Sequence, residues 1–216
     1  MKKIASPLFQ DLSEAELDTL AAAGHLRTRQ FAKHEVIFRA GSCVREIGIV
    51  LRGSVHIENL DLWGTKSILS NVGAGQAFAE TYAFCGEALM VDAVAAEHCE
   101  ILFLHTAALT DARIEPALQD KLLRRLLAVS MRKNLSLSQR IFCTTPKTVR
   151  GRLLTYFSAQ AARCGRMEFE VPFNRQQMAD YLNLDRSALS KELCKMRDEG
   201  LLEFDKNRFV LKQLPE

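Results

Sequence analysis

The hydrophobic positions in the first half of the chain predict a region built mainly from short β-strands. Between residues 31 and 75, β-branched and aromatic runs of four to seven residues alternate with polar turns. Glycines break these runs at Gly41, Gly53, Gly64, Gly73 and Gly75. Short strands at this turn spacing are typical of a compact β-sandwich or barrel. Within them, "VHIENLDLWGTKSIL" predicts a β-hairpin with Trp63 and Gly64 in or beside its turn.

Helical patterns flank this β-rich region. Before it, in "SPLFQDLSEAELDTLAAAG", Ser13 and Glu16 have the spacing of a capping box, and Gly24 is placed to end the helix. After it, the hydrophobic period changes to that of a long helix through "PALQDKLLRRLLAVSMRKNLSLSQRIF". Pro116 is tolerated in the first turn of that helix, and Pro146 marks a hinge or helix break beyond its end.

The long helix repeats a pattern at alternating spacings of four and three residues. The positions are Leu123, Leu127, Ser130, Asn134, Leu137 and Ile141. This is the spacing of a heptad seam between paired helices, in which a polar residue such as Asn134 commonly fixes the register. The seam predicts a homodimer. The alternative is one wide apolar face buried within a monomer, and a second stripe of Leu118, Leu122 and Val129 is placed to pack on the β-rich region.

The last part of the chain predicts two short helices followed by a hairpin. In "FNRQQMADYLNLDRSALSKELCKMRDEGLLEFDKNRFVL", Asn174 and Asp185 are placed to cap the two helices. Ala179 is small enough to let the helices approach, and Asn183 stands at the turn, where left-handed backbone is needed. The apolar contacts between them come from Met178, Leu182, Leu184, Leu189 and Leu193. Gly200 ends the second helix before a hairpin around residues 205–207, so the pattern is that of a winged helix-turn-helix.

Composition is that of an ordinary globular protein. Hydrophobic residues make up 48% and charged residues 25% of the 216 positions, and the longest apolar runs are too short to span a bilayer. The N-terminal stretch "MKKIASPLFQDLSEAEL" lacks the apolar segment of a secretory signal. Six cysteines without regular spacing are typical of reduced thiols in a cytoplasm. We therefore expect a cytoplasmic protein without membrane association.

Charge divides the chain into an acidic and a basic half. Residues 1–110 carry 9 Lys and Arg against 13 Asp and Glu, whereas residues 111–216 carry 20 against 13. A basic winged helix-turn-helix indicates that this half binds double-stranded DNA. Arg186, Ser187 and Ser190 lie one, three and four residues apart on the second helix, so they share a face and can enter one groove together.

With these parts in place, the whole chain resembles transcription regulators of the catabolite-activator (CRP)/FNR superfamily. The resemblance rests on the helix-turn-helix stretch and on "GAGQAFAE" with "VLRGSVHI" before it. It implies an α+β fold with three parts: a double-stranded β-helix (β-roll) sensor in residues 1–112, a dimerisation helix in residues 113–142 and a winged helix-turn-helix in residues 143–216. It also implies a homodimer on a near-palindromic DNA site, with RNA polymerase as a further partner.

The resemblance assigns roles to five residues of the DNA-binding domain. Positions that read base edges in the major groove match Arg186, Ser187, Ser190 and Lys191. Arg175 matches a position that contacts the DNA backbone. An arginine can contact guanine in a bidentate manner, which discriminates between bases by about 1–3 kcal/mol. Two alternatives stay open: Arg186 contacts only phosphate, and Lys191 reaches either a base or a phosphate.

One short segment departs from the superfamily. Cyclic-nucleotide sensors of the superfamily use a cassette that opens on a glycine turn, continues with a glutamate for the ribose hydroxyl and ends with Arg-Ser for the cyclic phosphate. Here the opening leads to Glu80, but Ala79 replaces the second glycine, and Leu89 and Met90 occupy the Arg-Ser positions. A phosphate facing these apolar side chains loses a charge-assisted hydrogen bond of about 1.5–3 kcal/mol and is desolvated. We therefore expect an effector other than a cyclic nucleotide.

What remains of the cassette is apolar. Its candidate effector-pocket residues are Phe78, Glu80, Tyr82, Leu89 and Met90. They predict a pocket for a small uncharged molecule with Glu80 as the polar anchor. The alternative is plain core packing in a regulator that has lost its ligand or responds by other means.

The sequence predicts neither a cofactor nor a catalytic site. No cysteine precedes Cys43, which argues against the iron–sulfur cluster of oxygen-sensing relatives, and the five histidines lack a context that marks a haem ligand. The adjacent residues of "HCE" point to alternating faces of a strand, so we expect no metal site there. The nucleophile–base and metal-cage motifs of enzymes are absent. Thiol redox chemistry at Cys85 and Cys99, a cyclic-nucleotide response and a β-roll protein that does not bind DNA stay open as alternatives.

Overall fold

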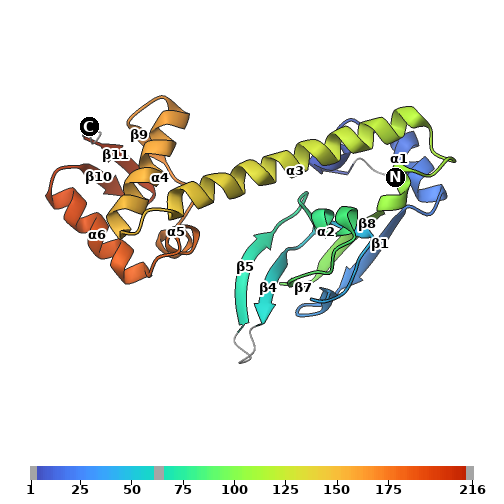
Figure 1. Cartoon of the computed structure of the whole chain (residues 1–216), viewed down its shortest axis with the longest axis horizontal. Helices are drawn as coiled ribbons and strands as arrows, with labels where there is room; N and C mark the ends of the chain where they lie inside the picture. The colour runs from blue at the N-terminus through green and yellow to red at the C-terminus, as the bar shows by residue number, and fades with distance from the viewer. Residues whose placement is uncertain (1–3, 61–65, 213–216) are drawn as a thin grey trace. The chain divides into compact units, whose positions relative to one another are not determined.

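The structure is a computed structural model that describes residues 4–60 and 66–212. The chain divides into two compact units, Met1–Arg132 and Lys133–Glu216, each with its own hydrophobic core. Strands predominate in the first unit and helices in the second (Figure 1), which confirms the predicted α+β fold. Helix α3 (Pro116–Thr144) contains the boundary between the units. Within the described residues, no helix has the length and apolar character needed to cross a membrane.

The segment before the sheets is helical, as predicted. A 3-10 turn, η1 (Pro7–Phe9), precedes helix α1 (Glu14–Ala22). Ser13 and Glu16 form the predicted capping box: the Ser13 hydroxyl accepts from the Glu16 N–H at 3.2 Å, and the Glu16 carboxylate accepts from the Ser13 N–H at 2.8 Å. Gly24 follows the helix with a φ of +82°, a left-handed conformation that glycine adopts without strain.

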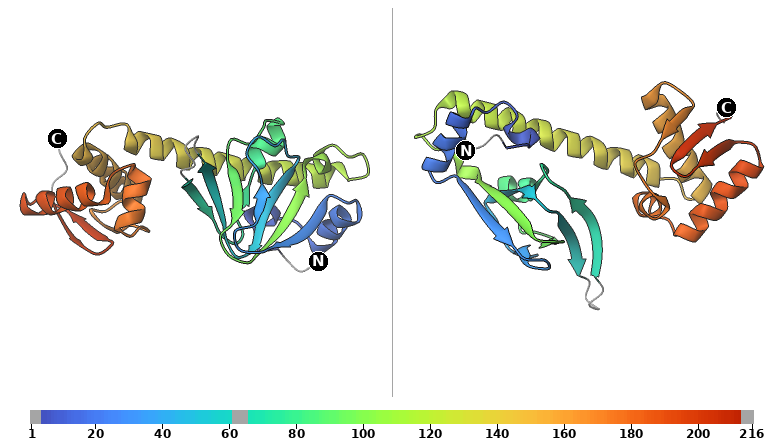
Figure 2. Two further views of the ribbon diagram at one scale, coloured as in Figure 1. Left: turned by 90° about the horizontal axis from the view of Figure 1, so that it is seen from below. Right: turned by 180° about the vertical axis from the view of Figure 1, so that it is seen from behind.

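Two four-stranded antiparallel sheets form the β-roll of the first unit (Figure 2). One sheet has the order β1-β8-β3-β6 and the other the order β2-β7-β4-β5. The strands are β1 (Leu26–Phe31), β2 (Val36–Phe38), β3 (Glu46–Arg52), β4 (Val55–Leu60), β5 (Lys66–Val72), β6 (Ala77–Phe78), β7 (Asp92–Ala95) and β8 (Cys99–His105). The predicted β4–β5 hairpin is present, and its predicted turn at Trp63 and Gly64 lies outside the described residues.

Aromatic rings fill the space between the two sheets. The ring centroid of Phe38, on β2, lies 5.8 Å from that of Phe78 and 5.7 Å from that of Phe103, and Phe31 lies 6.1 Å from Phe103. Because Phe78 and Phe103 belong to the other sheet, the two contacts of Phe38 join the sheets across the core, whereas Phe31 and Phe103 lie on the same sheet. Gly48 on β3 leaves room for Phe78, since a Cβ atom there would meet the ring at 2.3 Å. This part of the roll is therefore closely packed.

The first half of α3 completes the core of the first unit. Leu118, Leu122 and Leu126 are buried against the helical N-terminal segment and the roll. Their spacing of four residues keeps them on one face of the helix. The predicted packing stripe is confirmed for Leu118 and Leu122, but Val129 is only half-buried, and Leu126 continues the stripe in its place.

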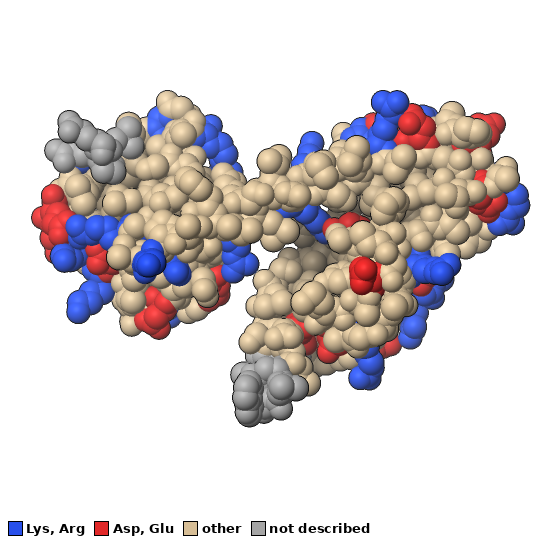
Figure 3. All heavy atoms as spheres, viewed as in Figure 1, with Lys and Arg blue, Asp and Glu red and all other residues tan. Residues whose placement is uncertain are grey.

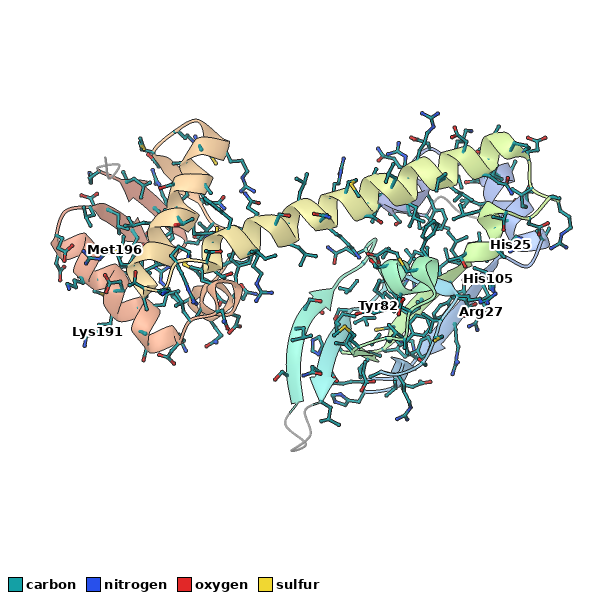
Figure 4. The ribbon with its side chains drawn as sticks, in the orientation of Figure 1. His25, Arg27, Tyr82, His105, Lys191 and Met196 are labelled. Atoms are coloured by element: carbon teal, nitrogen blue, oxygen red, sulfur yellow. The ribbon has the colours of Figure 1, made fainter. Side chains whose placement is uncertain are left out.

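A charged cluster joins the beginning of β1 to the segment that leads into α3. Buried His25 contacts the Asp111 carboxylate through Nε2 at 2.7 Å, and Figure 4 shows His25 close to His105. The Arg113 guanidinium donates to both oxygens of Asp111 and, with the Arg113 N–H and His25, holds the pKa of that carboxyl well below its usual range. These bonds position the start of α3 relative to the roll.

The second unit contains the predicted winged helix-turn-helix together with the end of α3. The break at Pro146 separates α3 from α4 (Val149–Cys164). The following elements are β9 (Glu168–Glu170), α5 (Arg175–Leu182), α6 (Arg186–Asp198), β10 (Leu202–Asp205) and β11 (Arg208–Leu211). The predicted hairpin of β10 and β11 is confirmed, and β9 adds a third strand that the sequence pattern did not predict. The largest side chains of its core are Tyr156, Phe157, Phe169, Met178 and Phe209.

Substituting Gly48 with Ala should destabilise the β-roll, because the new methyl group overlaps the Phe78 ring. Overpacking of this kind costs about 1–3 kcal/mol, which denaturant unfolding will measure. Gly73→Ala is the matched control, since its Cβ would meet no atom closer than 3.9 Å. Adding Phe78→Leu to Gly48→Ala should recover part of the loss. A double variant whose loss is the sum of the two single losses would show that the two residues are not in contact.

Candidate nucleic-acid interface and effector site

Side-chain caps define the two helices of the helix-turn-helix. Asn174 Oδ1 accepts from the Gln177 N–H and Gln177 Oε1 accepts from the Asn174 N–H, both at 2.9 Å, so the predicted cap of α5 is a complete capping box. Asp185 Oδ1 accepts from the Ala188 N–H at 2.9 Å and caps α6. Asn183 has the left-handed conformation predicted for the turn, with a φ of +54°. Local sequence thus determines where both helices begin and how the chain turns between them.

Two arginines from outside the motif hold this turn. Arg140, near the end of α3, donates to the last carbonyls of α5 at 2.9 and 3.0 Å. Arg152, on α4, donates to the carbonyls of Leu182 at 3.1 Å and Asn183 at 2.7 Å, and also to that of Pro146 at 2.8 Å. The last carbonyls of a helix have no intrahelical partner, and the helix dipole favours cations there. Sequence reasoning missed both arginines because they lie 30 or more residues from the carbonyls at the end of α5 and in the turn that they bind.

The inner face of α6 is attached to the rest of the unit by packing and by an ion pair. Its fully buried side chains are Leu189, Leu193 and Met196. Arg150, on α4, donates to the carboxylates of Glu192 at 2.6 Å and Glu199 at 2.9 Å. Both hydrogen bonds raise the pKa of Arg150, the one to Glu199 more than the one to Glu192. The opposite face of α6 is consequently the one that a ligand can reach.

The predicted base-reading residues lie at the start of that outer face. Arg186, Ser187 and Lys191 are exposed and Ser190 is half-buried. Figure 4 shows Lys191 projecting away from the helix. Ser187 has a local role as well: its hydroxyl donates to the carboxylate of the capping residue Asp185, and this bond lowers the pKa of Asp185. The long exposed cations at the start of this face are therefore Arg186 and Lys191.

Arg175, the predicted contact to the DNA backbone, packs against the wing. Its guanidinium lies 4.9 Å from the Phe204 ring centroid and 5.1 Å from that of Phe209, and burial lowers the pKa of Arg175. Cation–π contacts contribute about 0.5–2 kcal/mol, so Arg175 ties the start of α5 to the wing. Figure 3 shows further Lys and Arg side chains on the visible face of this unit. Beside Arg175, a hollow of about 470 Å³ is lined by Pro172, Phe173, Asn174, Lys206 and Asn207.

The outer face of α3 is apolar and exposed. The exposed fractions of the apolar seam residues range from 47% to 65%; these residues are Leu123, Leu127, Leu137 and Ile141. Of the polar seam positions, Ser130 is half-buried and Asn134 is exposed. Three more exposed apolar side chains lie on the same helix, namely Met131, Leu135 and Phe142. The described residues do not bury this face within the monomer, which favours the dimer seam over the alternative of a covered face.

The structure separates the residues predicted for the effector pocket. Phe78 belongs to the aromatic cluster inside the roll, and Leu89 is buried. Tyr82 is half-buried on the short helix α2 (Glu80–Cys85), and Glu80 is buried at the beginning of that helix. Met90 is 76% exposed, so its side chain faces solvent and not a shared cavity with the others. The spacing along the chain suggested a single pocket, but the backbone turns these side chains to different surroundings.

Ala79, which stands where the cassette of the superfamily has its second glycine, has a backbone conformation that favours glycine. Its φ of +62° lies in the left-handed region, immediately before α2. This conformation costs an L-residue about 1–2 kcal/mol relative to the right-handed helix. The turn that opens the cassette is therefore retained, whereas the side chains that follow it have changed.

A hollow of about 250 Å³, here named the α2–α3 pocket, opens between α2 and α3. Its lining residues are Glu80, Thr81, Phe84, Cys85, Leu123, Leu126, Leu127 and Ser130. Of these, Glu80 was predicted for the effector pocket, and Leu123, Leu127 and Ser130 were predicted for the dimer seam. Sequence reasoning missed the α2–α3 pocket because its two walls are far apart in the chain and meet only when α3 packs on the roll.

The cysteines predicted as possible redox sites have different surroundings. Cys85 is exposed, while Cys99 is buried and its thiol donates to the Ser54 carbonyl at 3.0 Å. Among the described residues, no three His, Cys, Asp or Glu side chains are grouped so that they could hold a metal ion. A redox role for either thiol stays an open alternative.

Protein-family comparisons match both units. A family model described as a cyclic nucleotide-binding domain matches residues 28–113. A second model, described as a Crp-like helix-turn-helix domain, matches residues 151–216. No curated protein matches the chain significantly.

Several solved structures resemble nearly the whole chain. The catabolite activator protein of Thermus thermophilus is 25% identical, with 96% of this chain and 94% of that chain covered and a TM-score of 0.50. The c-di-GMP responsive global regulator CLP of Xanthomonas campestris is 19% identical, with 93% and 100% covered and a TM-score of 0.56. CprK in complex with OCPA is 13% identical, with 94% and 91% covered and a TM-score of 0.65. Because the last two proteins are only 19% and 13% identical to this chain, the similarity to them shows a shared fold and nothing more.

Arg140→Ala should loosen the turn of the helix-turn-helix. It removes the charged donor from the carbonyls of Asp180 and Tyr181, and a hydrogen bond to a charged group contributes about 1.5–3 kcal/mol. Amide hydrogen exchange in residues 180–184 should then be about tenfold faster. Arg124→Ala is the control on the same helix, because the partner of Arg124 among the described residues is Asp120, at an exposed site where ion pairs contribute little. Equal exchange rates in the two variants would show that Arg140 does not hold the turn.

Proposed function

Because the chain belongs to the CRP/FNR family of DNA-binding transcription regulators, we propose that it binds a near-palindromic operator as a homodimer. The observation that carries the proposal is the outer face of α6, where Arg186 and Lys191 are exposed at the start of a capped and clamped helix. Transcription regulators of this family are not enzymes. We further propose a cytoplasmic location and RNA polymerase as a partner, both on the family resemblance.

Sequence recognition is proposed to come from the beginning of α6. Arg186 is the first residue of the helix, so its guanidinium can extend from the helix end toward a base edge, where a bidentate contact to guanine fits its geometry. Ser190 lies one turn further along the same face. Lys191 is proposed to contact a base or a phosphate. Ser187, whose hydroxyl is engaged with the α6 cap, is proposed to position the helix end as well as approach the DNA.

Attachment to the DNA backbone is proposed to involve the hollow beside Arg175. Lys206, in the turn of the wing, lines this hollow together with Arg175, the first residue of α5, and the capping residue Asn174. A helix N-terminus and nearby cations favour a phosphate. Because Arg175 packs on the wing, it is proposed to act on DNA in two ways, by its charge and by holding the wing in place.

The homodimer is proposed to form along the exposed seam of α3. A fully buried leucine or isoleucine side chain contributes about 1.5–3 kcal/mol, so pairing of the seam residues stabilises association. Asn134 stands among them as the polar residue that selects register. A two-fold axis through this seam presents two α6 helices to half-sites about 34 Å apart, the spacing of one DNA turn.

The effector is proposed to be something other than a cyclic nucleotide. The interior of the roll near the cassette is occupied by Phe38, Phe78 and Phe103. Leu89 is buried and apolar, and residues 67–112 contain no Lys or Arg that could neutralise a phosphate. Arg52, the nearest basic residue before that segment apart from Lys66, is close to the Glu100 carboxylate, with 3.8 Å between Nε and Oε2.

Arg186→Ala should weaken binding to the operator by about 1–3 kcal/mol and relax one base position. The reason is the loss of a bidentate base contact. Fluorescence anisotropy with an operator selected from a random duplex library, and with variants of each base pair, will measure both effects. Lys195→Ala is the control, because Lys195 lies on the same helix but in its last turn. This variant should weaken binding to all DNA sequences slightly and to the same extent. If the Arg186→Ala protein keeps its full preference for the operator sequence, Arg186 does not contact a base.

Leu127→Glu combined with Leu137→Glu should give a monomer with little operator affinity, because two charges would enter an apolar seam. Analytical ultracentrifugation will measure the mass in solution. Met167→Glu is the matched control, since it also places a carboxylate on an exposed apolar residue but lies outside α3. A double variant that still sediments as a dimer would mean that the seam lies elsewhere.

A further inference from the structure

The hollow beside Arg175, here named the wing hollow, has the size of a small-molecule site. Its volume of about 470 Å³ lies within the range of about 300–1,000 Å³ that is usual for ligand pockets. Its lining comes from two short segments, residues 172–175 before and at the start of α5 and residues 206–207 in the turn of the wing. Both segments belong to the second unit.

Hydrogen bonds hold the two sides of the wing hollow together. The Val171 N–H donates to the Asn207 carbonyl at 2.9 Å, and Asn207 Nδ2 donates to the Val171 carbonyl at 3.3 Å. On the other side, Asn174 is held by the capping box of α5, and the Phe173 ring packs on that of Tyr181 with 5.0 Å between centroids. The walls are therefore positioned before a ligand arrives, which lowers the entropic cost of binding.

Arg175 brings unused hydrogen-bond donors to the wing hollow. A guanidinium has five N–H donors. Among the described residues, the rings of Phe204 and Phe209 lie 4.9 and 5.1 Å from this guanidinium, and no carbonyl or carboxylate accepts a hydrogen bond from it. Burial lowers the pKa of Arg175, because the charged form loses part of its hydration. An anion beside the guanidinium stabilises that charge.

Lys206 adds a second positive charge to the lining, which contains no Asp or Glu. Two cations without a carboxylate favour a dianion over a monoanion. A phosphate monoester carries about −1.5 to −2 charges at pH 7, whereas each phosphodiester of the DNA backbone carries one. Arginine also binds phosphate oxygens in a bidentate manner. The charges of the wing hollow thus fit a phosphate monoester best.

Pro172 and Phe173 give the wing hollow an apolar wall beside these charges. Phe173 is half-buried, so part of its ring is exposed. Aromatic rings of many kinds stack on such a side chain, as bases do in proteins that bind single-stranded nucleic acids. The wing hollow therefore favours an anion that also carries a ring.

We propose that the wing hollow binds a free phosphate monoester that carries an aromatic ring, and that this ligand competes with DNA. The phosphate accepts hydrogen bonds from Arg175 and lies near the Lys206 ammonium, and the ring packs on Phe173. The competition rests on the proposed function, in which the same two cations attach to the DNA backbone. Because backbone contacts carry no sequence information, the ligand weakens binding to all DNA sequences alike.

Isothermal titration calorimetry of the full-length protein at constant ionic strength tests the ligand class. Phenyl phosphate is the probe. The matched controls are methyl phosphate, which lacks the ring, methyl phenyl phosphate, which is a monoanionic diester, and phenol, which lacks the phosphate. Phenyl phosphate should bind with a Kd about tenfold or more below that of each control, because a charge-assisted hydrogen bond or a stacked ring contributes at least that factor.

The pH dependence of binding identifies the monoester. Its second pKa is about 6, so the fraction of dianion, and with it the affinity for phenyl phosphate, should fall about fourfold from pH 7.5 to pH 5.5. The affinity for methyl phenyl phosphate should not change. Residues 133–216 contain no histidine, the side chain that ordinarily titrates in this range. The charged and titratable groups around the site are Arg175 and Lys206 in the lining, Asp205 and Arg208 on the wing, and Cys194 on α6.

Variants test the two cations separately. Lys206→Gln should raise the Kd of phenyl phosphate about threefold, because Lys206 is exposed and its charge is partly screened. Arg175→Gln should raise it about tenfold or more, and Arg175→Lys, which keeps the charge without the planar fork, should recover only part of the affinity. Lys195→Gln is the control, since it removes an exposed positive charge from α6 outside the lining. Melting temperatures show which variants are folded, and Lys206→Gln alters only an exposed turn.

Fluorescence anisotropy with operator and with random duplex DNA tests the competition. Phenyl phosphate at ten times its Kd should raise the apparent Kd of both DNAs about tenfold, because the unoccupied fraction of the protein falls as 1/(1 + [L]/Kd). If phenyl phosphate binds and neither DNA is affected, the wing hollow does not contact the DNA backbone. That result would overturn the competition and the proposed backbone attachment together.

Other results would overturn the ligand site. Absence of saturable phenyl phosphate binding, in a protein that binds its operator normally, contradicts this inference and leaves the proposed function intact. Equal affinity for phenyl and methyl phosphate would remove the ring, and equal affinity for phenyl phosphate and methyl phenyl phosphate would remove the monoester. Unchanged affinity in both Lys206→Gln and Arg175→Gln would place the ligand elsewhere on the protein.

Discussion

Helix α3 has apolar side chains on more than one face, and the first unit of the chain buries only some of them. Leu122 and Leu126 are buried in the core of the first unit, whereas Leu127 on a neighbouring face and Leu137 further along the helix are exposed. Each large apolar side chain contributes about 1.5–3 kcal/mol when it is fully buried. Burial of the exposed face against a second surface is therefore energetically favourable. The same helix supplies Arg140 to the helix-turn-helix. A single helix thus contributes to the core, carries the proposed dimer seam and binds the end of α5 next to the proposed recognition helix.

Packing inside the β-roll explains how a fold of the cyclic nucleotide-binding type can have another effector. Gly48 on β3 accommodates the ring of Phe78, and Phe38 joins that ring to the opposite sheet. A ligand that entered between Phe38, Phe78 and Phe103 would have to displace these packed rings. The turn at Ala79 nevertheless keeps its left-handed backbone, so α2 begins where the cassette requires it. An apolar hollow lies between α2 and α3.

The helix-turn-helix is held by charge at the end of α5 where the helix dipole is negative. Arg140 and Arg152 donate to consecutive carbonyls of this end, from two different helices of the same unit. Arg150 adds a pair of carboxylate contacts that attach α6 to α4. The orientation of the outer face of α6 is therefore set by contacts on its inner side and around the turn. Movement of the end of α3 would act directly on these bonds, which connects the proposed seam to the proposed reading face.

The sequence by itself determined the features that depend on neighbouring residues. The caps at Ser13, Asn174 and Asp185, the left-handed turn at Asn183, the long helix and the wing hairpin were all predicted, because each involves backbone groups a few residues away. Tertiary structure alone decided which distant side chains meet. The arginines on the α5 carbonyls, the wing contact of Arg175 and the two walls of the α2–α3 pocket join segments far apart in the chain. Such contacts depend on strand pairing and helix packing, and no local pattern of hydrophobic and polar residues specifies them.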